Sequence, residues 1–434
     1  MFSTRICRTT TVSILVLLTV SALGVISTSP VRAQQQSSEN AGLKQSLHSF
    51  YLSLDQARAI ALSQASPEFQ SQTRGHNIRF NSIYLTFSGA RDLSPDSIVV
   101  DSVNVVFTDY SNNAGLKNVV VTLDPSLAQV TNVETQDSFQ AGPVPNCASP
   151  PPVPAQKGPS PQNFCDPPPP PPPPCVSSAA GTNIWAGYGL KTSCNGISYV
   201  YEARSQWSIP AVSEPWTTAC QYYHCDLSIW PGLEDQLFGA SYLAQLGSDS
   251  GVYCGAGFCG YYYSLWYEFW PDNSVNCAHR YIAAQPGDHI DADVWNEIIN
   301  NGDYHNWDFL ITDTPANGAA AWGCQVVMNK SYYLPQASAF IAERPHFCQG
   351  VGCFAANYDT RLPFFNSFTM TAFMNQRNPS QTVSGWTAQN NKWYTSISMN
   401  NQDPKTGLWY NNLYPSAFDA SSTFTINYVQ STAT

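Results

Sequence analysis

The sequence predicts an all-β fold, one large β-sandwich, for the C-terminal part of the chain. From about residue 181 to residue 434, apolar and polar residues alternate in stretch after stretch, as in strands with one buried face. Aromatic and β-branched residues, which favour strands, are frequent there, and Gly, Pro, Asn and Asp separate the stretches at short intervals. No ten-residue stretch has strong helical periodicity. About 255 residues of strand and turn suit a single sandwich.

The clearest strand candidates are residues 198–210, 261–271, 280–299, 307–314 and 367–374. A further stretch, SYLAQLGSDSG (241–251), is expected to be a short strand that ends in a turn. It contains Gln245 at a position where an apolar residue would pack more favourably.

The first 33 residues have the features of a secretion signal. Arg5 and Arg8 precede the apolar stretch 11–26, and a small-residue cleavage site ends at Ala33. We therefore expect a secreted, extracellular protein, and a membrane anchor is the alternative interpretation. No other stretch approaches the roughly 20 apolar residues that a spanning helix needs.

Cysteine usage agrees with an oxidising compartment. The chain has 13 cysteines, and removal of Cys7 with the signal leaves an even number. CGAGFC (254–259) and CQGVGC (348–353) are predicted to be loops closed by disulfides. The histidines show no ligand spacing, so neither a metal site nor a cofactor is expected.

Residues 34–146 are predicted to form a small α+β unit. The spacing of apolar residues predicts a helix over 47–66 and strands within 97–110 and 116–136. Residues 147–180 form a proline-rich linker, whose eight consecutive prolines (167–174) should make a stiff rod of about 25 Å.

The charge balance excludes one class of partner. The formal net charge is −11 and only 11% of residues are charged, without a basic stripe. Nucleic acid is therefore not an expected partner. Few charges also mean few ion pairs to lose when carboxylates are protonated, which suits an acidic medium. An ordinary polar extracellular surface is equally compatible with this composition.

Carboxylates and amides are the chemistry that remains once the common nucleophile motifs are excluded. The chain has no Gly-x-Ser-x-Gly, no His-Glu-x-x-His and no pair of Asp-Thr/Ser-Gly loops. Glu268 lies in a stretch of aromatic residues, and Glu343 ends an apolar strand. Loss of hydration raises the pKa of such a carboxyl, which can then act as base and as acid. The alternative is that both face solvent or pair with an arginine.

Seven short blocks occur in an order that resembles the eqolisins, the glutamic endopeptidases of peptidase family G1. They are NIWAG (183–187), QWSIP (206–210), WPGLE (230–234), YLAQLG (242–247), WYEFWPD (266–272), PGDHIDADV (286–294) and AFIAERP (339–345). The resemblance implies two bent antiparallel sheets, a concanavalin-like sandwich, that form a cleft. It also implies a Gln–Glu catalytic dyad, which the matching motifs assign to Gln245 and Glu343.

The same resemblance suggests which side chains line the cleft: Trp185, Trp230, Glu234, Glu268 and Trp270. Core packing is the alternative role for each tryptophan. The chain departs from the family pattern at Glu234, Ser264 and Ala339, where aspartate, aspartate and glutamate are usual. These departures leave the surroundings of the dyad and the substrate preference open.

On this basis the sequence predicts a secreted acid endopeptidase that acts on proteins or peptides, as a monomer. Residues 34–146 would be a prosegment, released by cleavage within 147–180 and able to inhibit the enzyme, or an accessory domain that is retained. Two other functions stay open. One is a sandwich that binds or cleaves glycans, with Glu268 and Glu343 as its carboxylate pair, and the other is an inactive adhesion module of the same fold.

Overall fold

The computed structural model of the protein describes residues 30–91, 93–111, 117–137, 178–182, 184–191, 199–213, 225–235, 237, 240–255, 258–270, 272, 274–279, 282–299, 304–330, 335–348, 357–359, 362–378, 381–387, 394–402, 409–419 and 421–429. The expected signal stretch 11–26 and the proline run 167–174 lie outside these residues. Within the described part, no helix combines the length and the apolar character that crossing a bilayer requires.

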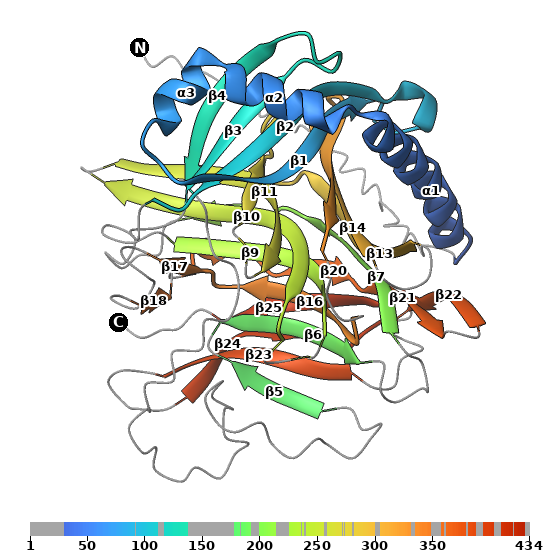
Figure 1. The fold of residues 1–434 in the computed structure, drawn as a ribbon. Coiled ribbons are helices and arrows are strands. Elements are labelled where there is room, and N and C mark those ends of the chain that lie inside the picture. The colour runs from blue at the N-terminus through green and yellow to red at the C-terminus, as the bar shows by residue number, and fades with distance from the viewer. Residues whose placement is uncertain are drawn as a thin grey trace, which may run out of the picture.

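The described residues of the N-terminal segment form three α-helices, a short 3-10 helix (Pro95–Ser97) and four strands (Figure 1). The α-helices and strands are α1 (Pro30–Ser53), α2 (Gln56–Ala65), α3 (Pro67–Thr73), β1 (Ile78–Gly89), β2 (Val99–Asp109), β3 (Lys117–Leu123) and β4 (Val130–Asp137). The single helix expected over 47–66 is interrupted, because the carboxylate of Asp55 accepts the backbone N–H of Arg58 and starts a new helix there. The strands expected within 97–110 and 116–136 are present.

Two layers of antiparallel strands form the predicted β-sandwich. The first layer runs in the order β11 (Phe258–Trp270), β10 (Leu243–Gly255), β9 (Cys225–Glu234), β16 (Ala337–Glu343), β6 (Trp185–Lys191) and β23 (Tyr394–Gln402). The second runs in the order β21 (Phe373–Asn378), β7 (Tyr199–Ser208), β13 (His289–Ile299), β14 (Tyr304–Thr314) and β15 (Ala321–Asn329).

Shorter strands join the layers at one side. The path from β23 to β7 passes through β24 (Trp409–Pro415), β25 (Thr423–Tyr428) and β20 (Phe368–Thr371). The remaining strands are β5 (Ser178–Thr182), β8 (Val212–Ser213), β12 (Val275–Cys277), β17 (His346–Cys348), β18 (Asn357–Asp359), β19 (Phe364–Phe365) and β22 (Gln381–Thr387). Apart from two separate pairs, β17 with β18 and β8 with β19, the strands of the described residues form one hydrogen-bonded sheet that folds over on itself.

Large side chains from both layers fill the interior. Phe269 of β11 meets Trp307 of β14 edge to face, with ring centroids 5.1 Å apart, and both are buried. Burial of each such side chain stabilises the fold by about 2–3 kcal/mol. Because successive residues of a strand point to opposite faces, the neighbours of Phe269 on β11 point away from this interior.

Strand β1, which the sequence analysis did not identify, carries the N-terminal segment into the second layer. It pairs antiparallel with β15, from Tyr84 opposite Val326 to Gly89 opposite Ala321. Residues 82–87 are buried in succession, because both faces of the strand are covered. Alternation between apolar and polar residues, the pattern that predicts a strand, is therefore weak here.

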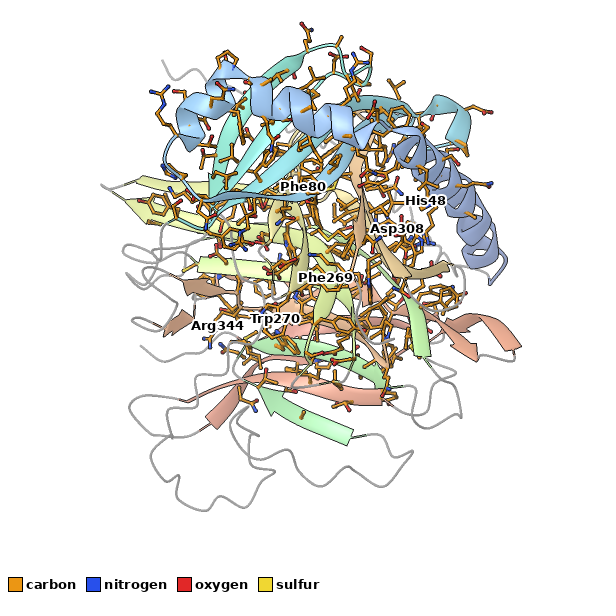
Figure 2. The ribbon with its side chains drawn as sticks, viewed as in Figure 1. His48, Phe80, Phe269, Trp270, Asp308 and Arg344 are labelled. Carbon is orange, nitrogen blue, oxygen red and sulfur yellow. A yellow bond between two sulfur atoms is a disulfide. The ribbon has the colours of Figure 1, made fainter. Side chains whose placement is uncertain are left out.

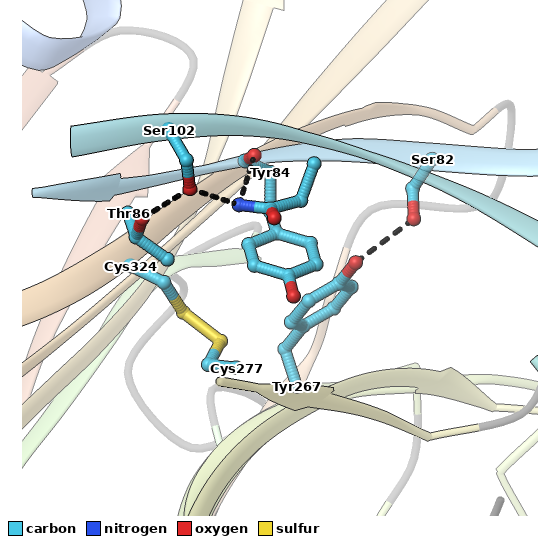
Figure 3. Close-up of a disulfide and its surroundings, with 8 residues drawn as sticks. Ser82, Tyr84, Thr86, Ser102, Tyr267, Cys277 and Cys324 are labelled. Atoms are coloured by element: carbon cyan, nitrogen blue, oxygen red, sulfur yellow. Dashed lines mark hydrogen bonds between the residues drawn. A yellow bond between two sulfur atoms is a disulfide. The ribbon is translucent and has the colours of Figure 1, made fainter. Parts of the chain in front are cut away.

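Two disulfides lie within the described residues. Cys254–Cys259 closes the hairpin between β10 and β11, which confirms the loop predicted for CGAGFC. Cys277–Cys324 ties β12 to β15 beside Thr86 of β1 (Figure 3). The loop predicted for 348–353 falls largely outside the described residues.

The stretch 241–251 does not end in a turn, as was expected, but continues as β10 to Gly255. Its polar residues are accommodated because neighbouring side chains bind them. The indole N–H of Trp207 donates to the hydroxyl of Ser248 at 2.9 Å, and the hydroxyl of Ser228 donates to Asp249. The prediction of a turn was wrong because sequence alone did not show these partners.

Candidate functional site

The register of the first layer brings Gln245 and Glu343 to the same face. Residues directly opposite each other in neighbouring strands share a face, as do residues two or four apart along a strand. Gly232 of β9 lies opposite both Gln245 of β10 and Ala339 of β16. Glu343 is four residues beyond Ala339, so its side chain points to the side of Gln245.

The other predicted residues follow by the same rule. Glu268 lies opposite Gln245, Trp185 lies opposite Glu343, and Trp230 is two residues from Gly232. All seven therefore share the face of the first layer that points away from the interior: Trp185, Trp230, Glu234, Gln245, Glu268, Trp270 and Glu343. Trp270 ends β11 and Arg344 directly follows β16 (Figure 2).

The amide of Gln245 is bound to a carboxyl of the neighbouring strand. Its Nε2–H donates to Oε2 of Glu268 at 2.6 Å, and both side chains are 0% exposed. Burial raises the pKa of Glu268 well above its ordinary value; the bond from Gln245 opposes this shift and the charge of Glu343 adds to it. Glu268 therefore favours its neutral form, and the bond fixes the orientation of the amide.

Glu343 is held by an indole. The Nε1–H of Trp230 donates to Oε2 of Glu343 at 2.7 Å, and Trp185 packs edge-on against Trp230 with ring centroids 5.4 Å apart. Glu343 is 0% exposed, as is Trp230. The two tryptophans thus serve as packing and as a hydrogen-bond anchor for the carboxyl.

Gly247 allows Trp230 to lie over β10. A Cβ at this glycine would be 2.2 Å from the carbonyl oxygen of Ile229 and 2.8 Å from Cβ of Trp230. Any side chain there would push β9 and β10 apart. The glycine is therefore part of what positions the indole on Glu343.

Two further carboxyls share this face, and the sequence analysis did not single them out. Asp249 accepts from Ser228, and Asp226 accepts from Tyr262. Burial raises the pKa of Asp249 to about 7 and that of Asp226 to about 8, against the hydrogen bonds that lower them. Asp249 was recognisable, because it lies four residues after Gln245 in a strand.

The face of the first layer that points away from the interior offers three features. These are the oriented amide donor of Gln245, the carboxyl of Glu343, which could accept and donate a proton, and the apolar surfaces of the tryptophans. Within the described residues, no group of three or more His, Cys, Asp or Glu lies in metal-ligating geometry. The side chains of Gln245, Glu268 and Glu343 are all completely buried.

The comparisons with known proteins point to one family. Residues 183–304 match the model of the Peptidase A4 family, and this span includes Gln245 and Glu268 but not Glu343. No curated protein matches the chain in sequence. The solved structures that match include two peptidases. The eqolisin peptidase SCP-B, in complex with the tripeptide Ala-Ile-His, is 16% identical, with 57% of this chain and 98% of that chain covered and a TM-score of 0.35.

The second is aspergilloglutamic peptidase from Aspergillus niger, which is 17% identical, with 47% of this chain and 99% of that chain covered and a TM-score of 0.30. The family match confirms the resemblance for the part of the chain that carries the first six motif blocks.

The buried carboxyls predict that stability falls as pH rises. Because the pKa values of Asp226 and Asp249 are raised on folding, the folded chain binds more protons than the unfolded chain between about pH 4 and pH 8, so the free energy of unfolding declines across this window. Asp249→Asn should flatten the decline between about pH 4 and pH 7 by on the order of 4 kcal/mol, because the pKa of Asp249 is about 7 in the folded chain. Urea unfolding across this range measures it; a stability that is constant or rises with pH would contradict the description.

The close approach at Gly247 predicts a marked difference between two glycines of one hairpin. Gly247→Ala should destabilise the protein by about 2 kcal/mol or more, because its methyl group meets the backbone of β9. Gly260→Ala is the matched control, since the nearest atom to its Cβ is 3.9 Å away. Chemical denaturation compares them, and equal effects would show that Trp230 does not depend on Gly247.

Proposed function

We propose that this chain, which is eqolisin-like over residues 183–304, is a secreted acid endopeptidase with Gln245 and Glu343 as its catalytic dyad. The observation that carries the proposal is the common face of the two side chains, with Glu268 orienting the first and Trp230 the second. The family match supports a peptidase and hence a protein or peptide substrate.

The proposed reaction needs no cofactor. Ionised Glu343 takes a proton from a water molecule, which attacks the scissile carbonyl carbon, and the carbonyl π electrons move to the oxygen. An N–H of Gln245 donates to that oxygen as negative charge develops, a contribution of about 3–4 kcal/mol in comparable oxyanion sites. Protonated Glu343 then gives its proton to the leaving amine as the C–N bond breaks.

An amide suits this role in acid. A second carboxylate at the position of Gln245 would compete with Glu343 for protons, whereas an amide stays neutral and keeps its donors at any relevant pH. Glu268 supports the arrangement because its raised pKa keeps it uncharged beside Glu343. The neighbouring face therefore contributes little negative charge in acid.

We also propose that the full-length chain is a monomeric, inactive precursor. Gln245, Glu268 and Glu343 are 0% exposed, so a scissile carbonyl does not reach them in this state. Cleavage within residues 147–180 is the expected activating step. The described contacts of the N-terminal segment go to the second layer, to Tyr267 on the interior face of β11, and to Ser274 and His279, which flank β12. This placement supports a structural role for the segment, and inhibition by it stays a prediction.

The proposed dyad predicts that removal of the side-chain amide of Gln245 greatly lowers peptidase activity. Gln245→Ala should lower kcat for hydrolysis of a denatured protein by about 10²–10³-fold, because the oxyanion loses its donor. Glu343→Gln should abolish hydrolysis, since no proton acceptor remains. Digestion is measured between about pH 2 and pH 6 with the chain cut in its linker.

Gln325→Ala is the matched control, because Gln325 is equally buried but lies on β15 of the second layer. Its kcat should stay close to that of the wild type. Equal losses for Gln245→Ala and Gln325→Ala, or cleavage of glycans without cleavage of protein, would contradict the proposed function.

A further inference from the structure

We propose that residues 41–137 are a permanent subunit of the β-sandwich, which stays bound without a covalent connection once the chain is cut between residues 138 and 177. The surface that holds this subunit is the outer edge of β15 together with the outer face of the second layer. The inference goes beyond the proposed function and does not depend on peptidase activity.

Strand β1 pairs with the backbone of β15 along the outer edge of that strand. Six consecutive residue pairs join the strands, and β2, β3 and β4 continue the layer outward. Without β1, β15 would expose a row of unpaired N–H and C=O groups, a surface prone to aggregation. Cys324, opposite Thr86 in this ladder, is bonded to Cys277, so a disulfide anchors the edge that β1 occupies (Figure 3).

Apolar side chains of the segment complete two cores of the sandwich. Phe87, 0% exposed, packs with Leu310 and Trp295 of the second layer. Gly323 of β15 makes room for it, because a Cβ there would be 2.8 Å from the ring. Tyr84 enters the interior between the layers and meets the ring of Tyr267, with centroids 5.9 Å apart.

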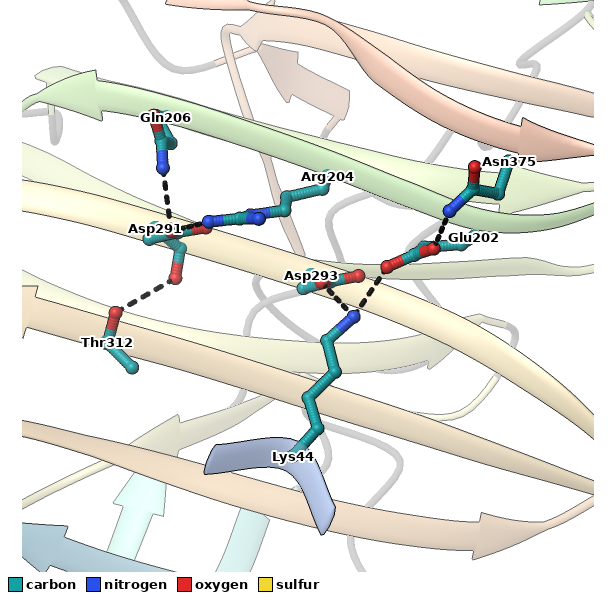
Figure 4. A network of polar contacts seen from close by, with 8 residues as sticks. All are labelled: Lys44, Glu202, Arg204, Gln206, Asp291, Asp293, Thr312 and Asn375. Atoms are coloured by element: carbon teal, nitrogen blue, oxygen red, sulfur yellow. Dashed lines mark hydrogen bonds and ion pairs between the residues drawn. The ribbon is translucent and has the colours of Figure 1, made fainter. Parts of the chain in front are cut away.

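Polar groups on the outer face of the second layer are satisfied by α1. Lys44 forms ion pairs with Glu202 of β7 and Asp293 of β13 (Figure 4). His48 contacts Asp308 of β14 at 2.9 Å (Figure 2). Loss of α1 would leave these three buried carboxyls without their partners on the helix, which is costly for buried polar groups and more so for charged ones.

Acid should weaken only some of the interactions between the N-terminal segment and the second layer. Burial raises the pKa of Asp293 to about 8, against the charge of Lys44. Burial also favours the neutral form of Glu202, but Lys44 outweighs it and holds the pKa of Glu202 below its ordinary value. The Lys44–Glu202 pair therefore persists in mild acid, and the strand pairing and apolar contacts do not titrate. The charged and polar groups that face one another here are Lys44, His48 and Tyr51 of α1, Glu202 and Arg204 of β7, Asp291 and Asp293 of β13, Asp308 of β14, and Asn375 of β21.

The test cuts the peptide chain between the two pieces after the protein has folded. A recognition sequence for a site-specific protease is inserted between residues 140 and 146 of the chain that begins at Gln34, so that the N-terminal piece carries no cysteine, and the folded protein is cut. Size-exclusion chromatography at about pH 7 and about pH 4 then measures whether the pieces stay together. We expect them to co-elute as a 1:1 complex at both pH values. Elution of the N-terminal piece by itself, or precipitation of the β-sandwich on cutting, would overturn the proposal.

Two phenylalanines of β1 provide matched variants. Phe87→Ala should weaken the complex of the cut pieces by about a hundredfold or more, because it empties a buried site. Phe80→Ala should leave the affinity unchanged, since Phe80 is 46% exposed on the same strand. Lys44→Met is a milder interface variant if Phe87→Ala does not fold, and it should also weaken the complex. Equal affinities for the Phe80 variant and the interface variants would show that these contacts do not hold the segment.

Discussion

The antiparallel register of β10, β9 and β16 is the constraint on which the candidate site depends. Side chains alternate between the two faces of a strand, so a slip of one residue would turn Gln245 or Glu343 into the interior. The interior resists such a slip, because Phe269, Tyr267 and their neighbours would then leave the apolar cluster that they form with the second layer. The packing that stabilises the sandwich therefore also aligns the polar residues on its other face.

The face of the first layer that carries Gln245 and Glu343 is buried, but many of its side chains are polar, whereas most buried surfaces are apolar. It gathers the carboxyls of Glu343, Glu268, Asp249 and Asp226 in a desolvated layer, where burial favours the neutral forms of the last three. Neutral carboxyls bound to Gln245, Ser228 and Tyr262 are compatible with the protein interior. The raised pKa values of these carboxyls would suit catalysis in acid. They also lower the free energy of unfolding at higher pH, because the buried carboxyls then have to ionise.

Local patterns in the sequence predicted much of this architecture, and contacts between distant segments account for the rest. Alternation predicted the strands around Glu268 and Glu343, and motif order predicted which residues share a face. Strand β1 was missed because burial on both faces removes its alternation. Asp226 and the bond from Gln245 to Glu268 were missed because strand register, which depends on the whole sheet, decides which side chains meet.

The central claim is that Gln245 and Glu343 act on the same carbonyl. A crystal structure of the linker-cut protein with a peptide whose scissile amide is replaced by a tetrahedral phosphinate tests it directly. The account predicts one phosphinate oxygen at about 3 Å from Nε2 of Gln245 and the other at about 3 Å from the carboxyl of Glu343. A phosphinate that contacts only one of the two side chains, or binds elsewhere on the molecule, would contradict it.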